Sequence, residues 1–311
     1  MMNYMSHASK MTGRRLPLVR TLLTVRALLM MSALFALSSA SAASNFVTLD
    51  GSSLVKTTIE LPLQGITLEY KANVRLLQVL DDANASFNAN ASSNENASGS
   101  IGYFPLSAQL FDKTNTQANE SNKANKTIEA KKRNVFSQLD AFSVEEPEAN
   151  LVRQQLASFQ YLNRVFIELD RNAVISQSGK NPLLVSSFHT NKSSDGQTQA
   201  FSLYLPQRPT SIQLMGAMKE SVTMNLIEHG TLNDYLDALP NGFVGESADK
   251  SVAYVVQPDG VVQTIQYAYW NEQPVYLAPG AIVFMAFYSL PSEYSTLNQD
   301  IVDLLRHKVG L

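Results

Sequence analysis

The chain has 311 residues, a formal net charge of −3 at pH 7 and no cysteine. A nearly neutral chain lacks the basic surface that nucleic-acid binding requires, and a chain without cysteine holds no disulfide and no thiolate metal site. The residues that follow position 43 are enough for one large hydrophobic core or two modest ones.

Residues 1–43 have the pattern of a secretory signal peptide. Arginines between positions 14 and 26 precede an apolar run at 27–37, and small residues follow up to Ala43. The apolar run is much shorter than the roughly 20 residues of a membrane-spanning helix, so cleavage after Ala42 or Ala43 is preferred over a membrane anchor. We therefore expect a secreted protein whose association with a membrane is only indirect.

Residues 44–207 are predicted to form a first domain. Alternating apolar residues predict strands at 57–61, 66–70 and 201–205, and a helical hairpin at 129–161 precedes another strand at 165–169. Residues 74–80 fit either a short helix or a strand. Two Asn/Ser-rich tracts, 84–100 and 114–127, have few apolar residues and are predicted to be disordered insertions.

Residues 208–290 are predicted to form a second domain, followed by an amphipathic helix in residues 291–311. Strands are expected at 212–216 and 222–226, a short helix at 230–240, and a hairpin whose turn is Asp259-Gly260. Strand, strand, helix, strand, strand is the order of a β-grasp fold, and the first domain has a compatible order once its insertions are removed. We therefore predict an α+β protein with two tandem β-grasp domains.

Several motifs carry a resemblance to a known family. They include Ala268-Tyr269-Trp270-Asn271, Pro279-Gly280 and Gln257 to Gly260 in the last sixty residues, and a strand-like stretch at 208–217. The order of these motifs resembles the end of the GfcC-like capsule-biosynthesis family, and residues 208–217 resemble the opening strand of the SLBB/β-grasp domains of polysaccharide-export channels. The resemblance covers roughly residues 45–311.

The resemblance implies a location and a role. It implies a periplasmic accessory protein in capsule or exopolysaccharide biosynthesis and export, built from SLBB-like domains. The implied partner is the polysaccharide-export machinery, such as an outer-membrane exporter, or the capsular polysaccharide itself.

No catalytic constellation accompanies this resemblance. The histidines are scattered, and the chain has no Gly-x-Ser-x-Gly elbow, no Gly-rich phosphate loop and no His-Glu-x-x-His motif. We therefore expect a non-enzymatic protein without catalytic residues, metal or cofactor. The alternatives are a periplasmic enzyme that modifies the polysaccharide and a carbohydrate-binding module.

Arg164 is the first candidate for a binding residue. The family carries Thr-Gly-Arg before a strand that ends in Leu-Asp, whereas this chain has Leu162-Asn163-Arg164, so only the arginine matches. The resemblance to this family implies that Arg164 lines a groove and binds an acidic sugar or a partner's carboxylate. The structural alternative is a salt bridge to Glu168 or Asp170.

Two further features have both a functional and a structural interpretation. Trp270 and Tyr269 could stack on sugar rings, although packing in the hydrophobic core is the favoured interpretation because tryptophan buries a large area. The C-terminal helix, expected at 292–307, has an apolar stripe formed by Tyr294, Leu297, Ile301, Leu304 and Leu305. This stripe either packs on its own domain, which is favoured, or docks on a partner.

Overall fold

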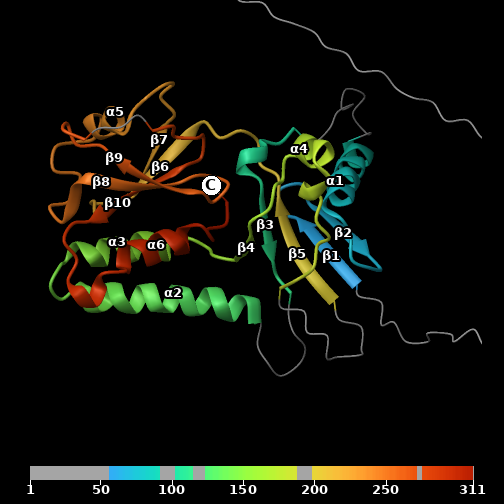
Figure 1. Ribbon diagram of the computed structural model, residues 1–311, viewed down its shortest axis with the longest axis horizontal. Coiled ribbons are helices and arrows are strands. Elements are labelled where there is room, and N and C mark those ends of the chain that lie inside the picture. Colours follow the sequence, from blue (N-terminus) through green and yellow to red (C-terminus); the bar gives the residue numbers. More distant parts are fainter. Residues whose placement is uncertain (1–55, 92–101, 115–122, 188–197, 272–274, 311) are drawn as a thin grey trace, which may run out of the picture. The chain divides into compact units, whose positions relative to one another are not determined.

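The computed structural model describes residues 56–91, 102–114, 123–187, 198–271 and 275–310 (Figure 1). The predicted signal peptide lies outside the described residues. Within them, no helix combines the length and the apolar character needed to cross a membrane. The described strands form two five-stranded sheets, so the expected α+β class is confirmed.

The first sheet has the strand order β2-β1-β5-β3-β4. Its strands are β1 (Lys56–Leu61), β2 (Ile66–Tyr70), β3 (Gln109–Asp112), β4 (Asn163–Val165) and β5 (Thr198–Tyr204). Adjacent β1 and β2 form an antiparallel hairpin, whereas β1 and β5 pair in parallel. The core of this sheet is shared with α1 (Leu76–Ala91) and α4 (Arg171–Ser176), which contribute buried Val79, Leu80 and Val174.

The second sheet has the order β7-β6-β10-β8-β9. Its strands are β6 (Ser211–Gly216), β7 (Val222–Asn225), β8 (Ala248–Val256), β9 (Val262–Gln266) and β10 (Ile282–Phe287). The central pair β6 and β10 is parallel. All six residues of β10 are buried, as expected for a strand covered on both faces.

Helices cover the two faces of the second sheet. On one face lies α5 (Leu232–Asp237), whose Leu232 and Tyr235 join a core with Leu214 and Val283. On the other face α2 (Lys123–Phe142), α3 (Glu148–Ala157) and α6 (Leu297–Leu305) share a larger core with Phe284 (Figure 1). Short 3₁₀ turns occur at Pro105–Ser107, Ser178–Lys180 and Ser292–Tyr294.

The predicted helical hairpin forms, but it packs elsewhere than expected. Sequence order placed residues 129–161 in the first domain, whereas the apolar stripes of α2 and α3 lie in the core of the second sheet. The buried side chain of Gln155 joins α3 to this sheet, because its amide bonds the backbone of Gly216 and Met218. A sequence pattern shows that a stripe must be buried, but it does not show against which sheet.

Three other local predictions need correction. The tract 84–100 begins as the second half of α1, because Leu76 to Ala83 anchor that helix and its later polar residues continue the same helical turns. The helix α2 begins at Lys123, inside the second tract. The strand expected at 165–169 ends at Val165, since Glu168 and Asp170 accept backbone N–H bonds that turn the chain into α4.

Candidate functional site: the Arg164 pocket

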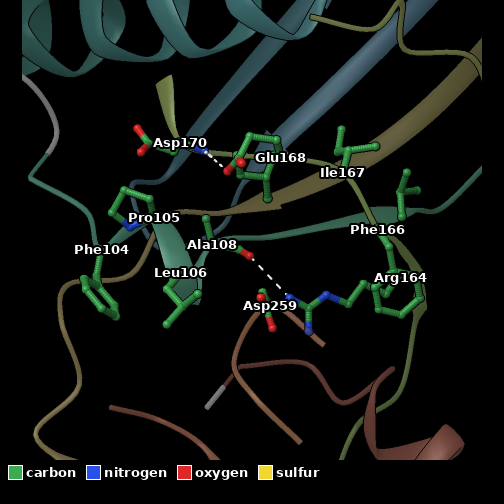
Figure 2. A pocket seen from close by; sticks show the side chains of 12 residues that line it. Phe104, Pro105, Leu106, Ala108, Arg164, Phe166, Ile167, Glu168, Asp170 and Asp259 are labelled. Atoms are coloured by element: carbon green, nitrogen blue, oxygen red, sulfur yellow. Dashed lines mark hydrogen bonds between the residues drawn. The ribbon is translucent and has the colours of Figure 1, made fainter. Parts of the chain in front are cut away.

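A pocket of about 400 Å³ surrounds the start of the segment that follows β4. Its lining comes from three parts of the chain: Phe104, Pro105, Leu106 and Ala108; the segment 164–170; and Asp259. Figure 2 shows the Arg164 side chain extending toward Ala108 and Asp259. The lining is therefore mostly apolar, with one arginine and three acidic residues.

Arg164 is buried, with 8% of its surface exposed, and it bonds to carbonyl groups instead of carboxylates. Its Nη2 donates to the Pro258 carbonyl at 2.5 Å and to the Ala108 carbonyl at 3.4 Å. Its Nη1 donates to the Arg306 carbonyl at 3.5 Å. Burial lowers the pKa of Arg164 to about 10, and the charge of Asp259 opposes this shift.

The structural alternative from the sequence, a salt bridge from Arg164 to Glu168 or Asp170, does not occur among the described residues. Glu168 pairs with Lys180 at 2.9 Å, and this bond lowers the pKa of the Glu168 carboxyl. Asp170 caps α4 by accepting the Asn172 N–H. Both carboxylates are therefore held by local partners, and Arg164 instead connects the start of β3, the β8–β9 turn and the end of α6.

The Phe166 ring of the pocket lies close to Arg164 and to a second arginine, Arg306, which is outside the lining. The guanidinium carbon of Arg306 lies 4.4 Å from the centroid of the Phe166 ring, and that of Arg164 lies 5.5 Å from it. Gly260 adopts φ +87°, and a Cβ there would meet the Phe166 ring at 2.5 Å. The turn therefore requires glycine both for its backbone conformation and for the close approach of the ring.

A buried histidine, His307, accepts a hydrogen bond from the backbone of Arg164. The Arg164 backbone N–H donates to Nδ1 of His307 at 3.1 Å. Burial, together with the nearby charge of Lys131, lowers the pKa of His307 to about 4. The neutral imidazole is the form that accepts this bond, so His307 acts as a positioning group in the structure.

The pocket lining combines apolar side chains with charged ones. Its described lining contains no serine, cysteine, histidine or lysine, and its carboxylates, Glu168, Asp170 and Asp259, each accept a bond from a local partner. No group of three or more metal-ligating side chains occurs in the described part of the chain. What remains is an apolar surface with one buried cation and carboxylates, which suits a neutral or weakly charged polar ligand.

The tryptophan region differs from the favoured prediction of core packing. Trp270 is 76% exposed and Tyr269 is 97% exposed, whereas Tyr267 is buried. The strand β9 ends at Gln266, and the turn closed by the Asn271 N–H bond to the Ala268 carbonyl lifts both rings away from the sheet. Neither residue lines the Arg164 pocket.

Another exposed aromatic residue in this region was missed. Tyr276 is 70% exposed, and the sequence offered no signal for it apart from its position near the tryptophan turn. The exposed rings of Tyr269, Trp270 and Tyr276 therefore lie close together in the sequence, and none of them is part of the hydrophobic core.

The C-terminal helix packs on its own chain. Leu297, Ile301 and Leu304 are fully buried, and Leu305 is nearly so. The Tyr294 ring packs on Phe142 with their centroids 5.2 Å apart. The apolar stripe is therefore covered by α2 and the sheet, which is the interpretation that the sequence favoured. These buried residues are not available for docking on a partner.

Comparison with known proteins identifies a family match and a curated relative. Residues 220–310 match the family described as "Capsule biosynthesis GfcC C-terminal". This part of the chain is similar to the C-terminal region of the GfcC-like family. The GfcC-like region begins before β7, ends with the segment after α6, and includes Trp270 and the apolar stripe of α6. Arg164 lies outside it.

A relative from a well-known bacterium supports the same assignment. The chain is 28% identical over 165 residues to the uncharacterized protein YjbG of Escherichia coli (strain K12). The match spans 51% of this chain and 60% of the relative's length. The expected GfcC-like resemblance is thereby confirmed.

Proposed function

We propose that the protein is a non-enzymatic accessory component of capsule or exopolysaccharide biosynthesis and export, located in the periplasm. The single observation that carries this proposal is the match of residues 220–310 to a capsule-biosynthesis family. Its partner is the polysaccharide-export machinery or the polymer itself. The basic and apolar pattern of residues 1–43 supports export from the cytoplasm.

The strand order supports the finer part of the proposal, two tandem SLBB-like β-grasp domains. In the second sheet the first and last strands, β6 and β10, pair in parallel at the centre, and α5 lies on one face. In the first sheet β1 and β5 also pair in parallel, with α1 in the core. Each unit thus has a hairpin at its start and a parallel return strand beside it.

The Arg164 pocket supports a role without catalysis. A carboxylate that acts as a catalytic acid or base must be able to exchange a proton with the substrate. A carboxylate whose oxygens are held by structural bonds is less suited to this role. Glu168 is paired with Lys180, Asp170 caps α4, and Asp259 accepts the Val261 N–H at 2.9 Å. The acidic side chains of this pocket therefore have local structural roles.

A deletion experiment tests this proposed function. Deleting the gene in an encapsulated host should reduce surface polysaccharide while the pool of intracellular precursors stays unchanged, and a plasmid copy should restore it. Normal surface polysaccharide in the deletion strain would contradict the proposal. A deletion strain with depleted precursors would instead place the defect in synthesis within the cytoplasm.

A carbohydrate-binding module is the second candidate, and the exposure of Trp270 and Tyr269 favours it. Aromatic rings that face solvent can stack on the apolar faces of sugars. Trp270 is the only tryptophan, so its fluorescence reports on this site alone. Titration with oligosaccharides from the host polymer should shift its emission, and an unchanged spectrum at saturating polymer would exclude this site.

A further inference from the structure

A second pocket, of about 550 Å³, contains a buried lysine. Its lining comes from the end of α3, the linker before β6, the polar face of β6 and β7, and the C-terminal segment. Lys308, on that last segment, is only 6% exposed. Fully buried lysines are rare unless they are paired, so the partners of this ammonium group need to be identified.

The protein satisfies only part of the hydrogen-bonding capacity of Lys308. Its Nζ donates to the Gly310 carbonyl at 3.3 Å and lies 5.0 Å from the centroid of the Phe159 ring. Among the described residues no carboxylate lies within salt-bridge distance of it. An ammonium has three donors, so two remain for a ligand.

The ammonium carries its charge at neutral pH. Burial lowers the pKa of Lys308 to about 8, and no acidic group of the described residues opposes the shift. A buried charge without a counter-ion destabilises the folded protein. A bound anion would supply the missing counter-ion.

The rest of the lining suits a sugar. Phe159, which also lines the pocket, provides an aromatic face. Ser211 and Gln213 alternate with buried Ile212 along β6, and Thr223 is paired with Gln213 across the sheet, so these polar side chains share one face. The lining contains no acidic residue, and its charged members are Lys308 and Arg208.

We propose that this pocket binds an acidic sugar unit of the polysaccharide, with the sugar carboxylate paired to Lys308. The hydroxyl and amide groups of β6 and β7 bond the sugar hydroxyls, and the Phe159 ring packs on an apolar face of the ring. The proposal rests on the proposed function, because it takes the ligand to be part of a surface polysaccharide. The volume lies within the range of small-molecule sites.

Binding to defined oligosaccharides tests the proposal. The purified protein is titrated by calorimetry with a tetrasaccharide that contains glucuronate and with the matching tetrasaccharide that contains glucose. The glucuronate form should bind at least about tenfold more tightly, because a charge-assisted hydrogen bond forms with its carboxylate. Sodium acetate, as a third probe, separates a general anion site from a sugar site, and it should bind more weakly than the glucuronate oligosaccharide.

Variants assign the binding to this pocket. Lys308→Met should reduce the preference for glucuronate by about tenfold or more, and Gln213→Leu should weaken both oligosaccharides. Lys219→Met, which removes an exposed lysine outside the lining, is the matched control and should bind as the unmodified protein does. Lys308→Met should also raise the melting temperature, which shows that lost binding is not lost folding.

Each other outcome overturns the inference. Equal binding of the two tetrasaccharides would remove the role of the carboxylate, and acetate binding as tightly as glucuronate oligosaccharide would reduce the site to one for any anion. Unchanged binding by Lys308→Met would place the ligand elsewhere. Because the deletion phenotype is measured separately, the proposed function can stand while this pocket fails.

Discussion

Replacing Arg164 by methionine tests whether this residue holds the pocket together. Methionine retains an apolar stem of similar length but leaves the Pro258 carbonyl without its donor. The bond at 2.5 Å is short and involves a charged donor, so it contributes about 1.5–3 kcal/mol. The bonds to Ala108 and Arg306, at 3.4 and 3.5 Å, are near the geometric limit and add little.

The net expectation is a loss of about 2 kcal/mol in the free energy of unfolding, because removal of a buried charge offsets part of the lost bonds. Urea denaturation followed by far-ultraviolet circular dichroism measures it. Arg164→Lys keeps one donor that can reach the Pro258 carbonyl and should lose about half as much. A methionine variant within about 0.5 kcal/mol of the unmodified protein would refute a structural role. Surface polysaccharide that falls in such a stable variant would identify Arg164 as a ligand-binding residue.

Three further predictions concern other residues. Gln155→Leu should cost about 2–4 kcal/mol, because it leaves the Gly216 N–H and the Met218 carbonyl unpaired in the core; urea denaturation measures it. Stability should fall by about 2 kcal/mol between pH 7 and pH 5, because the pKa of His307 is about 4 in the folded protein and near 6.5 when unfolded, so the unfolded chain takes up the proton first. Trp270→Ala should change stability by less than about 0.5 kcal/mol, because the ring is mostly exposed; thermal melting measures it.

Each of these predictions has a matched control. Gln154→Leu alters the exposed neighbour of the buried amide and should be nearly neutral, so an equal loss in both variants would contradict the argument. His307→Gln should flatten the fall in stability between pH 7 and pH 5, and an unchanged slope would assign it to other groups. Tyr267→Ala removes a buried ring and should destabilise the protein far more than Trp270→Ala does.

Local patterns in the sequence predicted much of the fold. The Asp259-Gly260 turn forms as expected, with Gly260 at φ +87°, because that backbone conformation favours glycine. The apolar stripes of α2, α3 and α6 are buried. In each case the signal is local, since it depends on residues within a few positions of one another.

Predictions that depended on distant contacts were less successful. Nothing near residues 129–161 indicates that the hairpin packs on the second sheet, since its amide link from Gln155 to Gly216 joins residues 61 positions apart. Arg164 lines a pocket, but its carbonyl partners lie 56 to 142 positions away along the chain. Trp270 was expected in the core because tryptophan is usually buried, and the turn after β9 overrides that tendency.

Lys308 was not selected at all from the sequence. A single lysine near a chain end is usually solvated, and its burial depends on the bridge between Tyr161 and Lys308 that brings the C-terminal segment beside α3. The residues around Tyr161 and Lys308 show no sequence pattern that predicts this bridge. The pocket therefore became visible only with the fold.

Incubation of the purified protein with the host's purified surface polysaccharide tests the central claim, a role without catalysis, most directly. Size-exclusion chromatography with light scattering measures the length of the polymer, and nuclear magnetic resonance measures its substituents. We predict that both remain unchanged after prolonged incubation with excess protein. Shortened polymer or altered substituents, in an amount that increases with protein concentration, would show an enzyme and contradict the account.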